Sequence, residues 1–478
     1  MAKKKKKKLS IAFAEAANPE WLIEHLPQYF CENNQKTAKL THIEIKHIWE
    51  SSKRVTVLYQ IDFNGTPDRK FSHQYVGYIV KKEKLATEYE KTLKSSRVLP
   101  PFGRAVTLVP EANLVLAAYP NDRKMKLLQK GDLANWLPKN IKKISGNTIN
   151  GVEVASGSVE PLRYVPDKRF TSRCSFMLKN GDARSDQTIS FIAKQLSDAW
   201  KAKRLFNGLK SLEKAFVARN ATKMDFTYPV RIPRPLALFE DKPVVFIEEI
   251  PGKNLKYALP QIDLRENMFK VGALLANFHK ADKRVPKKIT QRNEIAEVRS
   301  AAYLIRKTFP GMSKKVRAFF RKFQSVDWQD GAPKVLLHGS YRLNHIFIHD
   351  GELALLDLDS IRMGPPAYDV GNFLSSLYYL EAQGRFEGKT REAIQRHFLH
   401  GYAKHTKYRV HPRSVLWFLA SLLINKQAYK YVAHSHEDRE QKVEMMFGLA
   451  HEALEKCQTV PEAMVLDEVG DWMPDLKP

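Results

Sequence analysis

The fold of this 478-residue chain is decided by one stretch, which reads Val335-Leu-Leu-His338-Gly339-Ser340-Tyr-Arg342-Leu-Asn344-His345-Ile-Phe-Ile-His-Asp350-Gly351-Glu-Leu-Ala-Leu-Leu-Asp357-Leu-Asp359. Its apolar start predicts a buried strand, and Asp350-Gly351 is typical of a tight hairpin turn after a polar loop. Asp357 and Asp359 follow two residues apart, so the alternation of side chains along a strand predicts that both project to one face. Carboxylate oxygens are the ligands that Mg²⁺ prefers, so this pair is a candidate metal site beside the polar loop.

The stretch continues into Gly364-Pro365-Pro366-Ala367-Tyr368-Asp369-Val370-Gly371, and the combination resembles the aminoglycoside phosphotransferase and choline kinase family. That family has a protein-kinase-like fold, with a catalytic loop H-G-D-x-x-x-x-N, then a metal-binding Asp, then a G-x-P-x-x-D-[LV]-[AG] segment. His338-Gly339 matches the loop, Asp357 the metal-binding Asp and Asp369 the last segment. Asp369 is expected to cap the helix that it opens or, in addition, to brace the loop. The resemblance covers this stretch and, more loosely, residues 150–460.

The chain departs from the family pattern at two positions. Ser340 stands where the family has its catalytic Asp, and His345 where it has the metal-binding Asn, with Asn344 one residue early. A serine can orient an acceptor hydroxyl but cannot take its proton near neutral pH, and general-base catalysis is worth about 10²–10⁴ in rate. His345 is a softer ligand that suits Mn²⁺ better than Mg²⁺, or it could act as the base instead. The candidate catalytic residues are Ser340, His345 and, as a brace of the loop, His338; the candidate metal ligands are Asp357, Asp359 and His345.

The resemblance also implies nucleotide-binding residues ahead of the loop. Lys194 ends the run Ser190-Phe-Ile-Ala-Lys, where the family has its phosphate-binding lysine, and Glu213 on the following helix is its candidate ion-pair partner. An ordinary surface-strand lysine is the alternative for Lys194. The linker between lobes, whose backbone contacts adenine in the family, is matched by Glu248-Glu249-Ile250-Pro251-Gly252.

An internal repeat precedes these residues. Lys168-Arg169-Phe170-Thr171 echoes Lys53-Arg54-Val55-Thr56, and Ser190-Phe-Ile-Ala-Lys194 echoes Val76-Gly-Tyr-Ile-Val-Lys81. Both copies are rich in β-branched and aromatic residues, which predicts strands, and each is followed by a helical stretch. We therefore expect a duplicated β-rich unit, with Lys81 and Glu88 as the degenerate counterparts of Lys194 and Glu213.

The predicted fold class is α+β, a protein-kinase-like bilobal fold with an extra, duplicated N-lobe-like unit at the N-terminus. From residue 264 onward apolar residues recur at helical spacing, and only the motif stretch interrupts them. The predicted domains are a basic flexible arm over 1–17, a degenerate N-lobe-like unit over 18–145, a kinase-like N-lobe over 150–255, a helical C-lobe over 256–460 and a tail over 461–478.

The composition excludes several other classes of protein. With 43% hydrophobic residues, wholesale disorder is excluded, and the longest apolar runs are too short to span a bilayer. Three distant cysteines allow neither a disulfide framework nor a zinc knuckle, so a cytoplasmic location is expected. The net charge of +27 favours polyanionic partners, and the arm Lys3–Lys8 is a candidate contact for acidic lipid at a membrane surface or for nucleic acid.

Two functions follow from these observations. The first is an ATP-dependent phosphotransferase that uses Mg²⁺, or Mn²⁺, to phosphorylate a hydroxyl of a small molecule. The alternative is a pseudokinase, which binds nucleotide or a polyanionic partner without efficient catalysis, and the replacement of the catalytic Asp by Ser340 motivates it. No cluster of acids in the helical region indicates the acceptor.

Overall fold

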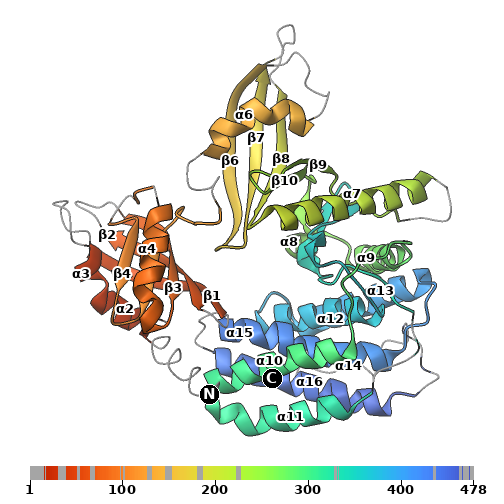
Figure 1. Ribbon diagram of the computed structural model, residues 1–478. Helices are drawn as coiled ribbons and strands as arrows, with labels where there is room; N and C mark the ends of the chain where they lie inside the picture. The colour runs from red at the N-terminus through yellow and green to blue at the C-terminus, as the bar shows by residue number, and fades with distance from the viewer. Residues whose placement is uncertain are drawn as a thin grey trace. The chain divides into compact units, whose positions relative to one another are not determined.

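The computed structural model describes residues 15–16, 18–30, 39–50, 54–64, 70–96, 98–100, 103–125, 132–145, 153–179, 187–221, 228–327, 331, 333–433, 438–461, 464, 466 and 473. They form an α+β fold (Figure 1), which confirms the predicted class. The chain divides into two compact units, and each is described by itself. The first holds residues 1–207, 235–249 and 433–435, and the second holds 208–234, 250–432 and 436–478. The lysines of the predicted arm lie outside the described residues.

The first unit begins with a five-stranded antiparallel sheet in the order β1-β2-β3-β5-β4. Helix α2 starts at Pro19 because the Asn18 side chain accepts hydrogen bonds from the backbone N–H groups of Glu20 and Trp21, at 3.0 and 3.3 Å. The elements of this repeat are α2 (Pro19–His25), α3 (Pro27–Phe30), β1 (Lys39–Glu50), β2 (Val55–Asn64), β3 (Lys70–Ile79), α4 (Leu85–Ser95), β4 (Val106–Val109) and β5 (Leu114–Ala118).

A second five-stranded sheet follows in the same order, β6-β7-β8-β10-β9, which confirms the predicted additional β-rich unit. Both sheets fix their last hairpin in the same way. The Val80 N–H donates to the Asn113 carbonyl at 3.2 Å, and the Leu196 N–H donates to the Pro243 carbonyl at 2.9 Å. The elements of this repeat are α6 (Asp132–Ser145), β6 (Glu153–Val165), β7 (Arg169–Lys179), β8 (Gln187–Leu196), α7 (Ala199–Ala221), β9 (Pro235–Phe239) and β10 (Val244–Glu248).

The helix that precedes each sheet packs on it through equivalent residues. Trp21-Leu22 of α2 lies on the first core, and Trp136-Leu137 of α6 lies on the second, where Trp136 stands edge-on to Phe239 at 4.5 Å between ring centroids. Figure 1 shows α6 across the face of its sheet. The duplicated unit therefore includes this leading helix, which extends the repeat beyond the strands that the sequence indicated.

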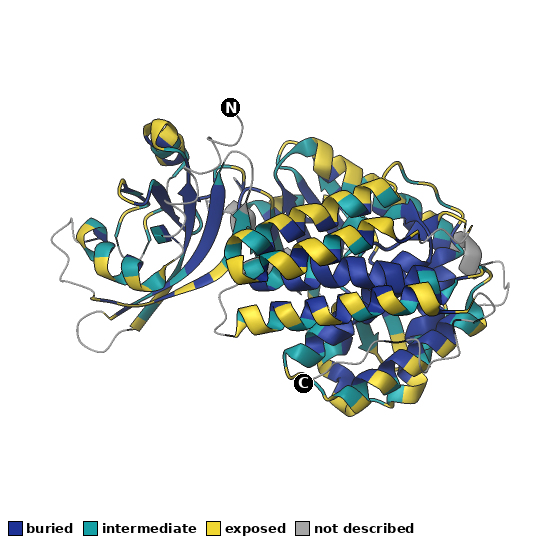
Figure 2. Cartoon of the chain, turned by 90° about the horizontal axis from the view of Figure 1, so that it is seen from below, coloured by how far each residue is buried: buried dark blue, intermediate teal, exposed yellow. Residues whose placement is uncertain are grey.

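The second unit is mainly helical. Its helices expose their outer faces and bury their inner ones, and Figure 2 shows this as yellow and dark-blue sides. Among the described residues, no helix is both long and apolar enough to cross a membrane. The helices are α8 (Leu255–Ala258), α9 (Leu264–His279), α10 (Gln291–Thr308), α11 (Ser313–Ser325), α12 (Ala367–Ala382), α13 (Gly388–His405), α14 (Pro412–Leu422), α15 (Tyr429–Ala433) and α16 (Arg439–Thr459).

Two small sheets lie among these helices. Strand β12 (Val335–Leu337) pairs with β15 (Arg362–Gly364), and β13 (Ile346–His349) forms the predicted hairpin with β14 (Glu352–Leu355). Asp350 and Gly351 both take positive φ at its tip, as a two-residue hairpin turn requires. Strand β11 (Lys253–Asn254) adds to β13. The loop between β12 and β13 carries the predicted catalytic residues.

The helical stretch from Pro412 to Ala433 is interrupted. A π-helical segment, Leu423–Ala428, separates α14 from α15. Such segments contain an extra residue per turn and are frequent at functional sites. Here the segment carries Lys426, which contacts the loop after β12.

Candidate functional site

The loop after β12 folds tightly because of Gly339. This residue has φ +77, and a Cβ atom there would lie 2.3 Å from the Ser360 carbonyl oxygen, so only glycine fits. His338 before it is fully buried and donates from Nε2 to the Leu356 carbonyl at 2.9 Å, while its Nδ1 accepts from the Ser340 N–H at 3.2 Å. Burial lowers the pKa of His338, which therefore stays neutral. The ring holds the loop to the end of β14.

Asp369 braces the same loop from α12. Its Oδ2 accepts from the His338 N–H at 2.7 Å, and its Oδ1 accepts from the Gly339 N–H at 2.8 Å. The fully buried His279 of α9 lies 3.2 Å from Oδ2 through Nε2 and faces the Tyr402 hydroxyl at 2.9 Å through Nδ1. Burial alone would raise the pKa of Asp369, but these hydrogen bonds lower it below its usual value. The carboxylate does not cap α12, since Pro366 is the residue at its N-cap.

Ser340 and His345 stand at opposite ends of the loop and are joined by a hydrogen bond. His345 Nδ1 lies 2.8 Å from the Ser340 carbonyl oxygen, and its Nε2 lies 2.8 and 3.1 Å from Arg342 nitrogens. Because arginine only donates, Nε2 accepts and Nδ1 carries the proton. Burial and the nearby Arg342 lower the pKa of His345 to about 2, so the ring is neutral. Asn344 is exposed, and its carbonyl accepts from the Asn254 side chain at 2.6 Å.

The two predicted metal-binding carboxylates do not lie on one strand face, because β14 ends at Leu355. Asp357 takes a left-handed conformation, with φ 58 and ψ 55, and Asp359 lies in a single 3₁₀ turn after it. Side chains do not alternate between two faces here, so the prediction that Asp357 and Asp359 project to one strand face is wrong. Asp357 Oδ2 instead lies 3.3 Å from His345 Nε2.

The described residues around the loop do not form a complete site for a metal ion. In the part of the chain that the structure describes, no three His, Cys, Asp or Glu side chains gather in a group that could hold an ion. His345 and Asp357 supply only two donors, and the imidazole nitrogen already accepts from Arg342. Mg²⁺ demands a shell of oxygens, so the pair does not fit it as arranged, and Mn²⁺, which accepts imidazole, fits better.

Cations from the π segment, α15 and β15 surround the loop, and sequence reasoning missed them. Lys426 donates to the Gly339 carbonyl at 3.1 Å and to Asn372 Oδ1 at 2.8 Å. Burial, together with Arg362, lowers the pKa of Lys426 to about 7. The pKa of Lys430 is also lowered, because it is buried near Arg342, and its ammonium lies 3.7 Å above the Tyr379 ring. The loop that lacks a carboxylate at position 340 is thus lined by basic groups.

The predicted nucleotide-binding residues fall on both units. Lys194 lies on β8, the third of five strands, and is only 8% exposed, so it is not a surface-strand lysine. The Glu249 carboxylate pairs with Arg173 at 2.6 Å. Glu248 ends β10, and Ile250 is buried. The ion pair between Lys194 and Glu213, a residue of α7 in the second unit, stays a prediction.

The expected counterpart pair in the first repeat is wrong. Lys81 lies 3.7 Å from Glu83, whereas Glu88 pairs with Arg54 and Arg123 at 2.9 and 3.0 Å. Glu88 serves a contact between the two repeats instead.

Comparison with known proteins gives one family. Residues 190–408 match the phosphotransferase enzyme family. No curated protein sequence matches the chain. Among solved structures, choline kinase from Cryptosporidium parvum Iowa II is 13% identical, with a TM-score of 0.46 over 69% of this chain and 96% of that one. A choline/ethanolamine kinase family protein from Mesorhizobium loti is 12% identical, with a TM-score of 0.36 over 59% and 85%.

A thermostable mutant of aminoglycoside phosphotransferase APH(4)-Ia is similar at 12% identity, with a TM-score of 0.40 over 66% of this chain and 98% of that one. The family match begins within β8 and ends after α13, so it contains the whole loop from His338 to His345 together with Asp357 and Asp369. Residues 190–408 therefore match the phosphotransferase enzyme family, in agreement with the sequence resemblance.

Proposed function

We propose that this protein is a pseudokinase, which holds the phosphate groups of a nucleotide but transfers phosphate inefficiently. The observation that carries the proposal is the exchange of charge at the catalytic loop. Ser340 replaces the carboxylate that would accept or orient the proton of the acceptor, and the Lys426 ammonium binds the carbonyl of the preceding residue.

The contacts that the loop keeps support nucleotide binding rather than phosphate transfer. The backbone around Gly339 is held by Asp369 and His338 in the manner of a working site. The imidazole of His345 is neutral, but its acceptor nitrogen is occupied by Arg342, which makes it a poor substitute base. Arg342 supplies positive charge that attracts phosphate directly, and a phosphate beside Lys426 and Lys430 would favour the charged forms that burial disfavours.

The restoring variant Ser340→Asp tests this proposal. We expect thermal stabilisation of the natural protein by Mn-ATP or Mg-ATP with negligible turnover, and a rise of about 10²-fold or more in ATP turnover on Ser340→Asp. Ser300→Asp, on the exposed face of α10, is the matched control. The double variant Ser340→Asp/Lys426→Gln removes the ammonium that could neutralise the new acid. Equal or faster turnover by the natural protein would overturn the proposal.

A second candidate is an ATP-dependent phosphotransferase that acts on a hydroxyl of a small molecule. Two observations favour it: Asp357 lies beside His345 at the family's metal positions, and the pKa of Lys426 is near 7, the range of an effective general base. Turnover with a panel of sugars, amino alcohols and aminoglycosides, lost in Asp357→Ala and in Lys426→Met, would support it. Turnover indifferent to Asp357→Ala would exclude a metal role for that residue.

The cytoplasmic location and the role of Lys3–Lys8 are also proposals. If the arm docks to acidic lipid or nucleic acid, removal of residues 1–8 will reduce the salt sensitivity of that binding.

A further inference from the structure

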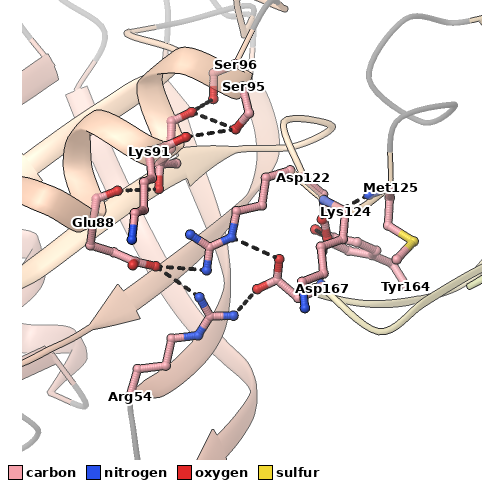
Figure 3. Close-up of polar contacts among 12 residues, drawn as sticks. Arg54, Glu88, Lys91, Ser95, Ser96, Asp122, Lys124, Met125, Tyr164 and Asp167 are labelled. Carbon is pink, nitrogen blue, oxygen red and sulfur yellow. Dashed lines mark hydrogen bonds and ion pairs between the residues drawn. The ribbon is translucent and has the colours of Figure 1, made fainter. Parts of the chain in front are cut away.

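The two β repeats of the first unit are joined by a partly buried ion-pair cluster, formed by Arg54, Glu88, Arg123 and Asp167. Arg54 precedes β2 and lies between the carboxylates of Glu88 and Asp167, as Figure 3 shows. Arg123, after β5, contacts the same two acids at 3.0 and 3.5 Å. Asp167 comes from the β6–β7 turn of the second repeat and is 6% exposed. Two cations and two acids thus neutralise each other between the repeats.

Asp122 extends this contact. Its Oδ2 accepts from the Tyr164 hydroxyl at 2.8 Å and from the Asp167 N–H at 2.7 Å, and its Oδ1 accepts from Lys124 N–H at 2.8 Å (Figure 3). Asp122 is fully buried, so these bonds replace water completely. The β6–β7 turn is therefore held against the end of β5.

A cleft of about 380 Å³ lies beside this cluster and is lined from both repeats. Strand β1 contributes Lys46, His47 and Trp49, while β6, its turn and the start of β7 contribute Arg163, Lys168 and Arg169. Among the described residues that line it there is no Asp or Glu, although Lys46 also pairs with Glu44 at 2.6 Å. Arg169 is the repeat equivalent of Arg54, so the arginine of one repeat serves the ion-pair cluster and the arginine of the other lines the cleft.

The cleft also offers an aromatic surface. Trp49 is half-buried, packs with Tyr164 against the core around Leu58 and Val76, and lies 4.1 Å from the His47 ring between centroids. A rigid indole beside several cations matches a ligand with a flat ring and a phosphate, since bases stack on aromatic side chains while the backbone follows positive charge. A bare phosphate would leave the indole unused, and a duplex hides its bases.

We propose that this basic cleft binds single-stranded nucleic acid, with a base on Trp49 and phosphates on Arg163 and Lys168. Its volume is that of a small-ligand site, enough for about one nucleotide of a longer strand. The chain's charge of +27 favours the approach of such a polyanion. This inference is independent of the proposed pseudokinase function.

Fluorescence anisotropy of a labelled oligouridylate of about 12 nucleotides, within the range that such grooves cover, tests the proposal on the full chain. We expect Trp49→Ala to weaken binding by about 5- to 150-fold, and Trp49→Phe to restore most of it. Arg163→Ala and Lys168→Ala should each reduce the slope of log affinity against log salt by about 0.7. Trp200→Ala and Lys389→Ala, both at exposed positions, are the controls and should change neither quantity.

The N-terminal lysines are separated from the cleft by a full-length variant with Lys3–Lys8 replaced by alanine. We expect this variant to keep the dependence on Trp49. Binding that is lost with the arm lysines and indifferent to Trp49→Ala would overturn the proposal. So would stronger competition by duplex RNA or by phosphatidylserine vesicles than by unlabelled single strand, because either result would assign the cations to another ligand.

Discussion

Asp369 illustrates how one buried side chain can position a loop that belongs to another element. Its two oxygens accept from two consecutive backbone N–H groups and face His279, so the carboxylate has no capacity left for a substrate. It is therefore a positioning residue, and its loss is expected to act on stability first.

We predict that Asp369→Asn lowers the free energy of unfolding by about 2–4 kcal/mol at pH 7. The side-chain amide must turn its NH₂ group toward a group that donated to the carboxylate, such as the backbone N–H of His338 or Gly339, so that two donors face each other. The pKa of Asp369 is lowered in the fold. Its ionisation therefore stabilises the protein fully above the usual Asp pKa, and this stabilisation is lost as the pH falls from that value through the lowered pKa. Urea denaturation at several pH values measures both effects. Asp350→Asn, at the exposed hairpin tip, should change stability by less than about 0.5 kcal/mol; similar losses in both variants would contradict the assignment.

Several site residues could be predicted from the sequence because short motifs report local chemistry. His338, Ser340, His345 and Asp357 all lie in or beside one loop, as the motif indicated. The shared face of Asp357 and Asp359 was wrong, since a left-handed residue at 357 breaks the strand alternation. Aspartate tolerates this conformation better than most residues, but its presence alone does not predict it. The contact of Arg342 with His345 could not be predicted, because it depends on the direction of the arginine side chain, which sequence spacing does not specify.

Helices α9 and α13 meet at two glycines. A Cβ atom on Gly401 would lie 2.1 Å from the Phe269 carbonyl oxygen, and one on Gly272 would lie 2.1 Å from the Phe398 carbonyl oxygen. Backbone, unlike a flexible side chain, cannot move away without shifting a whole helix.

We predict that Gly401→Ala destabilises the protein by about 2 kcal/mol or more, because the methyl group forces the two helices apart. Gly448 is exposed on α16 and has no atom within 4 Å of a new Cβ, so Gly448→Ala should stabilise by about 0.5–1 kcal/mol through helix propensity. Thermal and urea unfolding of the two variants give the comparison. Equal effects would mean that the helices separate more easily than their packing implies.

The π segment over 423–428 places a lysine where its charge is disfavoured. Lys426 faces Arg362 and Arg342 as well as the acids Glu294 and Asp369, and its pKa is lowered to about 7. Below pH 7 both folded and unfolded chains carry the charge; between pH 7 and 10.5 the unfolded chain binds more protons, so stability rises with pH in this window.

We predict that the free energy of unfolding of the natural protein rises between pH 7 and 9 relative to Lys426→Met, which has no group to titrate. Lys389→Met, at an exposed position, controls for the loss of a lysine as such. Urea denaturation across this range is the measurement, and parallel curves for the natural protein and Lys426→Met would refute the assignment.

Element types were largely predictable, and the exceptions have physical causes. The long strands and α9 carry clear alternation or helical spacing. Strands β4 and β9 are too short to show a period, and the proline inside α6 argues against a helix there although its apolar face is periodic. The π segment was expected as continuous helix because a single extra residue shifts the apolar spacing too little to be noticed in the sequence.

At the scale of the first unit, the two repeats depend on the ion-pair cluster of Arg54, Glu88, Arg123 and Asp167. We predict a coupling free energy of about 1.5–3 kcal/mol between Arg54→Met and Asp167→Asn in a double-mutant cycle, since removing one partner leaves a buried charge behind. The exposed pair Lys315 and Glu444, whose charged atoms lie 2.8 Å apart, should couple by less than about 1 kcal/mol. Comparable couplings for both pairs would show that the cluster does not join the repeats.

The duplication itself could be seen from short echoes, of which the one between Arg54 and Arg169 joins equivalent positions. The echo that ends at Lys81 and Lys194 is out of register, since the sheet pairing makes Tyr78 the equivalent of Lys194. The contact between the repeats could not be predicted from the sequence, since it joins Arg54 to Asp167 across more than a hundred residues. Such pairings are decided by the packing of whole sheets, which single-sequence patterns do not report.

The identical strand order of the two sheets has a consequence for biogenesis. While the chain is being made, β3 offers an open edge to its own β4–β5 hairpin, and β8 later offers an edge of the same kind to β9–β10. A hairpin that docks on the wrong edge would give a compact but misassembled chain, a characteristic failure of tandem repeats. Vectorial synthesis, which completes the first sheet before the second edge emerges from the ribosome, avoids this exchange, whereas refolding from denaturant exposes both edges at once.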